Sequence, residues 1–440
     1  MTDEAVLREL AAACPAARAA GDADAVAGVV PRFAASPASV AEASALLRAA
    51  AGHELSVVAR GGGSRLDWGA PPRRCDLVVG TSRLDQVLEH AAGDLVARVQ
   101  AGLSLHKLGE VLAAAGQQLA LDEAPGGNGQ RPAATIGGTL ATGMAGPRRL
   151  RYGTPRDLVI GITVVRADGT VASSGGKVVK NVAGYDLGKL FAGSYGTLGL
   201  IVEAAFRLHP LPAAASYTTV DTDGPAAARA AVAAAAASEL APVAVEISRA
   251  ARDQPVRVGV LLEGDPGGVA ERAAVLRGLL GDGAASSGEA PGWWGRLEPP
   301  AGPGTLVRVA FWAAALPRVL AAIDAAAAAV PADPQVAGSA ASGVLYAALP
   351  ASTGPAAAAG FVAGLREALA RGDADARPAS APLPDSPPVL ASAVVVHAPP
   401  AVRKLVDLWG PVPGLSLMRA VKDQFDPGHR MAPGRFAGGI

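Results

Sequence analysis

The residues best suited to bind a ligand lie in a glycine loop. Arg60-Gly61-Gly62-Gly63-Ser64 follows a short apolar run that ends at Ala59. Consecutive glycines tolerate positive φ, so successive backbone N–H groups can point at one anion. A pyrophosphate suits such a loop, and a tight turn without a ligand is the alternative. The loop lacks the spacing of a P-loop, and Pro71-Pro72 prevents the helix that follows a Rossmann glycine motif.

A second glycine-rich stretch lies between residues 134 and 146. Glycine in a loop costs backbone entropy, so such loops usually exist because something approaches the main chain closely. Further motifs follow in a fixed order. The full series is Ala134-Thr135-Ile136-Gly137-Gly138-Thr139, Ala141-Thr142-Gly143, Gly146-Pro147-Arg148, Arg151-Tyr152-Gly153, Arg156-Asp157-Leu158, Ala167-Asp168-Gly169, Gly175-Gly176-Lys177, Lys180 to Asp186 and Gly193 to Gly199.

This ordered set resembles the FAD-binding domain of the p-cresol-methylhydroxylase (PCMH) type, which vanillyl-alcohol-oxidase-like enzymes share. The resemblance covers roughly residues 30–212. It implies an α+β fold, with a two-subdomain FAD-binding domain and an α+β cap domain. Within the family, the run from Lys177 to Asp186 and the short length most resemble the FAD-binding E subunits of bacterial glycolate oxidase complexes.

The resemblance also assigns cofactor contacts to matched positions. It implies that the glycine loop cradles the FAD pyrophosphate. Thr135, Gly137 and Gly138 are expected against the ribityl and phosphate groups, where a larger side chain would clash. Ile201 and Val202 belong to a strand that passes the cofactor. The expected cofactor-binding residues are Arg60, Gly61, Gly62, Gly63, Ser64, Thr135, Ile136, Gly137, Gly138, Thr142, Gly143, Asp157, Gly196, Thr197, Gly199, Ile201 and Val202.

Two departures from the family bear on chemistry. Many relatives attach FAD covalently through a histidine just after the glycine loop, whereas this chain has Ser64-Arg65-Leu66 there. The flavin is therefore expected to be non-covalent. The catalytic subunits of 2-hydroxy-acid dehydrogenases also carry a late metal-binding motif rich in histidine. Here His397 and His429 have no spaced partner, so both are expected to be structural, and no metal site and no catalytic residue is assigned.

The resemblance leaves three functional interpretations open. In the first, the chain is the FAD-binding subunit of a glycolate oxidase-like complex. It then passes electrons from a small 2-hydroxy acid to a second flavoprotein subunit and an iron–sulfur subunit. In the second, it is an accessory or assembly flavoprotein without substrate chemistry of its own. In the third, it is a self-sufficient FAD-linked dehydrogenase of another substrate.

Two further charged segments attract attention. Arg148, Arg149, Arg151 and Arg156 form a basic cluster that could meet an acidic partner surface or lie in a solvated loop. Near the end of the chain, the run from Lys422 to Pro427 and Pro433-Gly434-Arg435 resembles the family's closing motif, K-x-x-x-D-P…P-G-R. Because proline fixes φ, this segment is expected to return to the FAD domain along an extended path.

Length and composition limit the number of domains, the partners and the location that the chain can have. The chain has 440 residues, of which 50% are hydrophobic, and a formal net charge of zero. This length favours two domains, and the zero charge gives no basic field for nucleic acid. Two cysteines cannot hold an iron–sulfur cluster, which usually needs four thiolates. The N-terminus does not resemble a signal peptide, and no apolar stretch is long enough to span a bilayer. The expected location is cytoplasmic, with contact to the inner membrane only through partners.

Helices and strands that are separated by glycines must position these residues. Ser39 is expected to cap a helix from Val40 to Ala51, and Leu55 to Ala59 is expected to be the buried strand before the loop. Asp168-Gly169 predicts a hairpin turn. The second half alternates strands and helices, as in one sheet covered by helices. The expected domains are an FAD-binding domain in residues 1–213, a cap in 214–414 and a return segment in 415–440, with residues 372–388 in an exposed loop.

Overall fold

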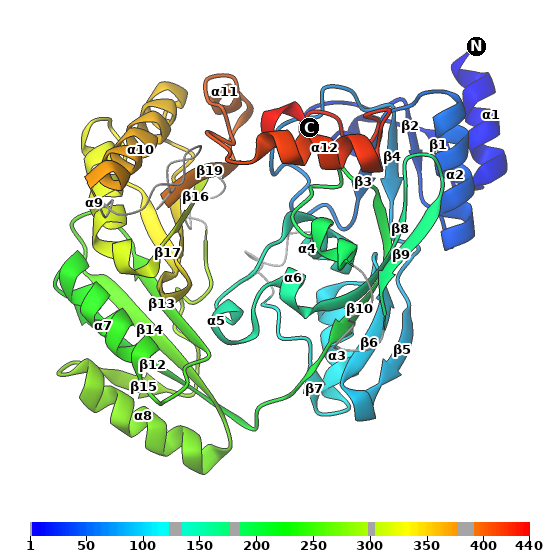
Figure 1. Ribbon diagram of the computed structural model, residues 1–440. Coiled ribbons are helices and arrows are strands. Elements are labelled where there is room, and N and C mark those ends of the chain that lie inside the picture. The colour runs from blue at the N-terminus through cyan, green and yellow to red at the C-terminus, as the bar shows by residue number, and fades with distance from the viewer. Residues whose placement is uncertain (1, 123–133, 177–184, 298–303, 376–390) are drawn as a thin grey trace. The chain divides into compact units, whose positions relative to one another are not determined.

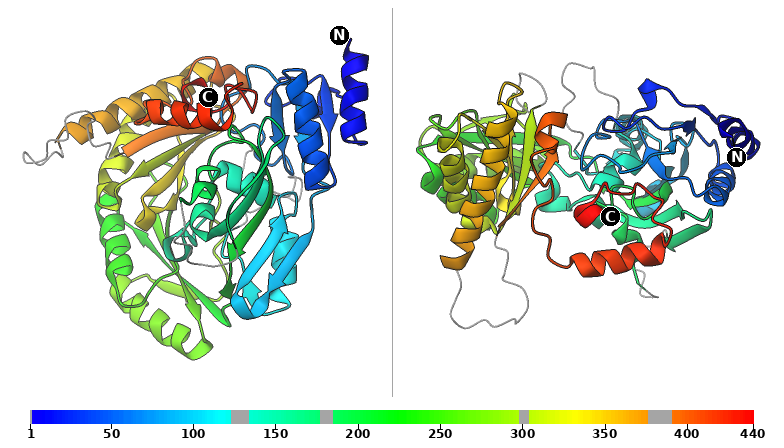
Figure 2. Two further views of the ribbon diagram at one scale, coloured as in Figure 1. Left: turned by 45° about the vertical axis from the view of Figure 1, so that its right-hand side comes forward. Right: turned by 90° about the horizontal axis from the view of Figure 1, so that it is seen from above.

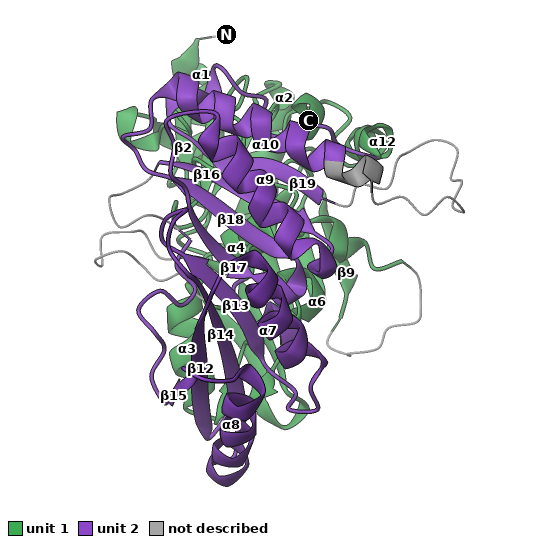
Figure 3. Ribbon diagram, turned by 90° about the vertical axis from the view of Figure 1, so that its left-hand side faces the viewer, with its two compact units in different colours: residues 1–145, 153–211, 414–440 green, residues 146–152, 212–413 purple. Residues whose placement is uncertain are grey.

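The computed structural model describes residues 2–122, 134–176, 185–297, 304–375 and 391–440. Helices and strands are mixed along the whole chain, which confirms the α+β class (Figure 1). The chain divides into two compact units. Unit 1 contains residues 1–145, 153–211 and 414–440, and unit 2 contains residues 146–152 and 212–413 (Figure 3). The short segment 146–152, expected in the FAD-binding domain, thus groups with unit 2.

Unit 1 contains a four-stranded sheet in the order β1-β2-β4-β3. Its strands are β1 (Arg18–Ala19), β2 (Phe33–Ala35), β3 (Val57–Arg60) and β4 (Leu77–Gly80). Strands β2 and β3 both pair in parallel with β4, and β1 pairs antiparallel with β2. Helices α1 (Asp3–Ala13) and α2 (Val40–Gly52) contact each other. The end of β3 carries the glycine loop.

A five-stranded antiparallel sheet forms the rest of unit 1, in the order β5-β6-β10-β8-β9. Its strands are β5 (Val87–Ala91), β6 (Val96–Gln100), β8 (Val159–Val165), β9 (Val171–Gly175) and β10 (Leu200–Arg207). Strands β7 (Gln117–Gln118) and β11 (His209–Pro210) form a two-stranded sheet. The helices of this part are α3 (Leu105–Ala113), α4 (Ile136–Thr142), α6 (Pro155–Leu158) and α12 (Leu415–Phe425).

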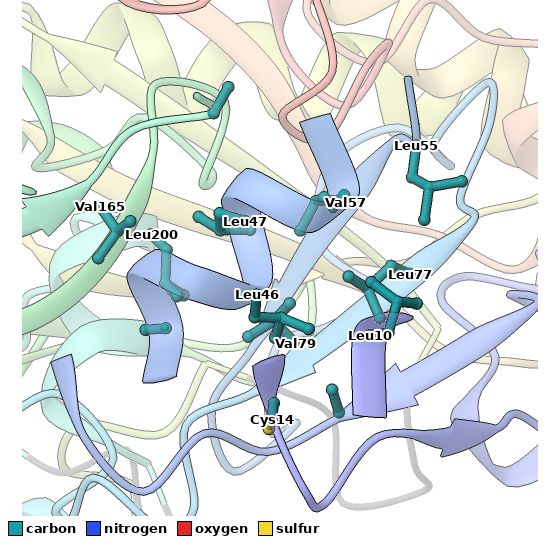
Figure 4. Packing of buried hydrophobic residues seen from close by; sticks show 14 of the residues in the cluster. Leu10, Cys14, Leu46, Leu47, Leu55, Val57, Leu77, Val79, Val165 and Leu200 are labelled. Atoms are coloured by element: carbon teal, nitrogen blue, oxygen red, sulfur yellow. The ribbon is translucent and has the colours of Figure 1, made fainter. Parts of the chain in front are cut away.

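The N-terminal core of unit 1 forms because α2 is amphipathic. Ser39 caps this helix, since its side chain accepts a hydrogen bond from the Glu42 N–H at 3.1 Å. Leu46 and Leu47 of α2 are fully buried and pack with Leu77 and Val79 of β4 (Figure 4). This packing holds the sheet from which the glycine loop projects.

Unit 2 is built on one eight-stranded antiparallel sheet in the order β15-β12-β14-β13-β17-β18-β16-β19. Its strands are β12 (Ala214–Thr222), β13 (Ala244–Arg249), β14 (Val256–Gly264), β15 (Ala285–Ser287), β16 (Thr305–Phe311), β17 (Gln335–Ser339), β18 (Val344–Leu349) and β19 (Ala391–His397). Figure 2 and Figure 3 show the long helices on one face of this sheet. The helices of the unit are α5 (Arg149–Tyr152), α7 (Pro225–Ala237), α8 (Pro266–Leu280), α9 (Leu316–Ala328), α10 (Pro355–Asp375) and α11 (Pro400–Arg403).

Several local predictions are confirmed and others are wrong. Helix α2 begins after Ser39 as expected, and Gly169, with φ of +83°, lies in the turn between β8 and β9. The sequence did not predict α1 or β12. The C-terminal segment is not wholly extended, because α12 precedes its prolines. Helix α10 continues to Asp375, so the expected loop does not begin at 372, and residues 376–390 lie outside the described part of the chain.

Candidate functional site

A pocket opens in unit 1 at the end of β3. Figure 1 labels this strand. Three segments that are far apart in the sequence form its walls: the loop after β3, the start of α4, and the turn that leads into β10. The lining residues are Val58, Ala59, Arg60, Gly61, Gly62, Gly63, Ser64, Arg65, Leu66, Thr81, Thr135, Gly137, Gly138, Ala141, Thr142, Tyr195, Gly196, Gly199, Leu200, Ile201 and Arg435.

The glycine loop forms the first wall. Gly63 has φ of +86°, a conformation that side-chain-bearing residues rarely adopt. A Cβ atom on Gly61 would lie 2.2 Å from Thr135 Oγ1, so the loop approaches the start of α4 closely. Among the described residues, no acceptor takes a hydrogen bond from the backbone N–H groups of residues 61–64. Because backbone donors are almost always paired, these groups are available to an anion in the pocket.

The start of α4 forms the second wall. Thr135 caps this helix, because its Oγ1 accepts a hydrogen bond from the Gly138 N–H at 3.3 Å. The Gly137 N–H donates to the carbonyl of Ala101 at 2.7 Å, and a Cβ on Gly137 would lie 2.9 Å from Ala101 Cβ. The glycine at 137 is therefore required by packing within the protein. The sequence predicts that the cofactor also requires this glycine, and that stays a prediction; packing against Ala101 is a separate reason.

The turn before β10 forms the third wall. Gly196 has φ of +75° and follows Tyr195, whose φ is +55°. Gly199 has φ of +159°, and a Cβ there would lie 3.1 Å from the Val165 carbonyl oxygen. Ile201 lines the pocket, whereas Val202 is fully buried in the N-terminal core. The alternation of β10 thus separates two neighbouring residues that were both predicted to meet the cofactor.

Five predicted residues do not line the pocket and instead support its walls. Ile136 is buried in the core beneath the antiparallel sheet, and Gly143 ends α4 with φ of +64°. Buried Thr197 donates its hydroxyl to the Ser194 carbonyl at 2.7 Å. The Asp157 carboxylate accepts hydrogen bonds from the Thr154 N–H and hydroxyl at 2.8 and 2.7 Å. Val202 completes this group.

Charge is distributed unevenly around the loop. Arg60 lies 3.7 Å from Asp24, which is itself paired with Arg18 at 2.7 Å. The hydrogen bond from Arg18 holds the pKa of Asp24 below its usual value. The Arg65 guanidinium lies 5.5 Å from the centre of the Trp68 ring, a cation–π distance. The guanidinium of Arg435 is buried beside the same loop, and its Nη2 donates to the carbonyls of Leu66 and Trp68, both at 2.7 Å.

Sequence reasoning missed several lining residues. Thr81 follows β4, the parallel neighbour of β3, and Tyr195 lies within a recognised glycine motif. Arg435 comes from the far end of the chain. The signal that could have identified it was the Pro433-Gly434-Arg435 motif, because its resemblance to the family's closing motif places it at the FAD domain.

Arg148 and Arg151 of the basic cluster differ in burial and in their partners. Arg148 of unit 2 pairs with Glu263 through Nη2 at 2.7 Å and Nε at 3.0 Å, and the Glu263 side chain is only 2% exposed. The Tyr152 hydroxyl also donates to Glu263, at 3.3 Å. Arg148 is thus a structural ion-pair residue, while Arg151 is exposed. These contacts explain why segment 146–152 belongs to unit 2.

The remaining candidate ligands and aromatics have local partners. His429 lies 2.9 Å from Asp423 and is exposed. Within the described ranges, no group of three or more His, Cys, Asp or Glu side chains could hold a metal ion. Trp293 and Trp294 pack over Gly259, and Trp294 meets the Tyr217 ring edge-on at 5.0 Å. The two tryptophans therefore cover the sheet of unit 2.

The pocket fits the dinucleotide that the sequence implied. It combines a glycine cradle with open backbone donors, which suits a diphosphate, and apolar walls from Val58, Leu66 and Ile201, which suit ring systems. A family model described as an FAD binding domain matches residues 31–175. The chain therefore contains an FAD-binding domain of the PCMH type. Its sequence relatives are named as oxidase subunits, dehydrogenases or FAD-linked oxidoreductases.

Three of these relatives illustrate the similarity. The chain is 38% identical over 176 residues to glycolate oxidase subunit GlcD of Bacillus subtilis, which covers 40% of this chain and 36% of the relative. It is 39% identical over 174 residues to D-lactate dehydrogenase of Archaeoglobus fulgidus, covering 40% and 38%. It is 37% identical over 176 residues to D-2-hydroxyglutarate dehydrogenase of Xanthomonas citri pv. viticola, covering 40% and 36%. The chain therefore matches well under half the length of each relative.

Solved structures share the fold over a longer span. p-Cresol methylhydroxylase has a TM-score of 0.69 at 14% identity, covering 98% of this chain and 96% of the other. 4-Ethylphenol oxidase from Gulosibacter chungangensis has a TM-score of 0.68 at 14% identity, with the same coverage. These structures support the fold alone. In the described part of the chain, no helix is long and apolar enough to cross a membrane.

Proposed function

We propose that this protein is the FAD-binding subunit of a 2-hydroxy-acid dehydrogenase complex of the glycolate oxidase kind. The observation that carries the proposal is the glycine-walled pocket, whose first two walls lie within the segment that matches an FAD binding domain. The substrate class follows from relatives named for glycolate, D-lactate and D-2-hydroxyglutarate. All three compounds carry a hydroxyl group beside a carboxylate.

The chain's own residues hold and orient the cofactor. Residues 61–64 offer backbone donors to the diphosphate, and Thr135 keeps the start of α4 against that loop. Gly196, Gly199 and Ile201 form the opposite wall. FAD, when bound, supplies a two-electron acceptor for oxidation of the hydroxy acid. Ser64-Arg65-Leu66 stands where related proteins place an attaching histidine, so we propose non-covalent binding.

We propose that the electrons then leave through a partner. The two cysteine thiols of the chain are buried in unit 1, in separate hydrophobic clusters. Burial raises the pKa of the Cys75 thiol to about 12, which makes it a poor metal ligand or redox group. A second flavoprotein subunit and an iron–sulfur subunit are the partners we propose. Any contact with a membrane is then made through them.

Anaerobic reduction of the flavin tests this proposal. The FAD-loaded chain is mixed with millimolar glycolate or D-lactate, alone and together with the proteins that co-purify with it from native cells. We expect slow bleaching near 450 nm by the chain alone and rapid bleaching in the complex. Rapid, complete bleaching by the chain alone would instead show a self-sufficient dehydrogenase. Bleaching confined to a partner's flavin would identify an accessory subunit.

A further inference from the structure

The C-terminal segment of unit 1 lies beside the strand that carries the glycine loop. The Val57 N–H donates to the Arg430 carbonyl at 2.8 Å, and the Ala432 N–H donates to the Val57 carbonyl at 2.7 Å. Val57 and Met431 form an isolated parallel bridge. Residues 430–432 therefore extend the four-stranded sheet past β3. The segment is part of the frame of the pocket, although it is separated from β3 by more than 350 residues in sequence.

Hydrogen bonds from a buried lysine link the same segment to the third wall of the pocket, the turn before β10. Lys422 is 0% exposed, and its Nζ donates to the carbonyls of Thr197 at 2.7 Å and Met431 at 2.9 Å. The third acceptor is the Asp426 carboxylate at 2.7 Å, which also accepts from the Met431 N–H at 2.7 Å. Thr197 follows the lining residue Gly196. Lys422 and Asp426 thus fix the C-terminal segment against both the turn before β10 and the start of β3.

The chain then turns, and Arg435 lies in the lining of the pocket. Gly434 has φ of +89°, and a Cβ there would lie 2.7 Å from the Arg73 side chain, so the turn favours glycine. Arg435 itself is 4% exposed. Its Nη2 donates to the carbonyls of Leu66 and Trp68, and these hydrogen bonds hold the guanidinium beside the loop.

Arg435 is more deeply buried than Arg60 and Arg65, the two other arginines that line the pocket. Arg60 is directed toward Asp24, and Arg65 lies over Trp68. Neutral backbone donors can orient a diphosphate but do not neutralise it, whereas a guanidinium does both.

We propose that Arg435 is a binding residue for the diphosphate of FAD, and that Lys422 and Asp426 are its positioning pair. The C-terminal segment therefore contributes a binding residue and its positioning pair to the cofactor site. The inference rests on FAD binding in this pocket.

Affinity measurements on the apoprotein test the role of Arg435. Arg435→Met should raise the Kd for FAD by roughly 10–100-fold, the range for a hydrogen bond to a charged group. It should also flatten the dependence of Kd on salt, because an ionic contact is lost. Arg435→Lys retains the charge and should recover part of both effects. Arg419→Met, at an exposed position in α12, is the control and should match the wild type.

The outcomes distinguish binding from simple stabilisation. An Arg435→Met protein with wild-type Kd, or with a weaker Kd and an unchanged salt dependence, would overturn the proposal. If that variant does not fold, Arg435→Gln decides. It keeps a hydrogen-bonding side chain but removes the charge, so the proposal expects a flatter salt dependence, whereas a purely structural role predicts the wild-type dependence. A wild-type protein that binds no FAD would instead overturn the cofactor assignment, and this inference with it.

A double-mutant cycle tests the positioning pair. Lys422→Met should weaken FAD binding and flatten its salt dependence in the same way as Arg435→Met. The double variant should bind FAD no worse than Arg435→Met alone, because Lys422 acts through Arg435. A Lys422→Met protein that is less stable to urea but keeps the wild-type Kd and salt dependence would show that the pair serves stability only.

Discussion

The contact between Gly61 and Thr135 gives the sharpest prediction about the pocket. A Gly61→Ala methyl group would lie 2.2 Å from Thr135 Oγ1, a distance that atoms cannot maintain. Thr135 would have to rotate and lose its hydrogen bond with the Gly138 N–H, which costs about 1 kcal/mol for a helix cap. Overpacking adds about 1–3 kcal/mol. We therefore expect Gly61→Ala to destabilise unit 1 by about 2–4 kcal/mol.

A second substitution makes the reasoning specific. Thr135→Ala removes Oγ1, and the nearest remaining Thr135 atom is then Cβ, at the ordinary distance of 3.4 Å. The double variant should therefore lose only the cap, about 1 kcal/mol. The assays are urea unfolding of the apoprotein and titration with FAD. Gly109→Ala is the matched control, because nothing lies within 4 Å of a Cβ there. Two results would refute the close approach: additive losses of unfolding free energy in the double variant, or a Gly61→Ala protein that is as stable as the wild type.

Three further predictions concern the frame and the cofactor. Burial alone would raise the pKa of Asp76, but hydrogen bonds from Ser56 and the charge of Arg74 outweigh burial and lower it. A lowered folded-state pKa gives stability that is complete above the unfolded value, about 4, and is lost as the pH falls through the folded value. Asp76→Asn should therefore be less stable than the wild type at pH 7. The difference in unfolding free energy between the two proteins should shrink as the pH falls in acid unfolding experiments. A difference that stays constant with pH would contradict this. Arg148→Met leaves the buried Glu263 carboxylate without its ion-pair partner and should lower the free energy of unfolding in urea by about 3–5 kcal/mol. The exposed control Arg151→Met should lower it by less than about 0.5 kcal/mol. Equal losses in the two variants would rule out the anchoring role of Arg148. Acid precipitation should release FAD into the supernatant, and flavin retained in the pellet would show a covalent bond.

Local chemistry made part of this structure predictable. Ser39 caps α2 as its side chain suggested, and the glycines after β3 and before β10 line one pocket. Strand β12 was missed because its buried positions include Ser216, Thr218 and Thr222, which do not resemble core residues. Its pairing with β14 along nine residues determines that conformation, and this is tertiary information.

Long-range contacts account for features that local sequence patterns do not show. Lys422 looks like a surface lysine in sequence, yet its acceptors include Thr197, which lies 225 positions away. Arg148 looked like part of a basic surface, but it forms an ion pair with the buried Glu263 carboxylate. Gly137 was assigned to the cofactor, and Ala101 also requires it. In each case the decisive partner lies on another element, so only the folded chain reveals it.

The central claim is that FAD binds in the glycine-walled pocket of unit 1. Hydrogen–deuterium exchange of the apoprotein with and without saturating FAD tests this claim most directly, because bound donors exchange more slowly. We expect FAD to protect peptides that contain residues 61–66, 135–142 and 195–201, while the sheet of unit 2 keeps its apoprotein exchange rates. Protection confined to peptides of unit 2, or binding of FAD without protection of residues 61–66, would contradict the account.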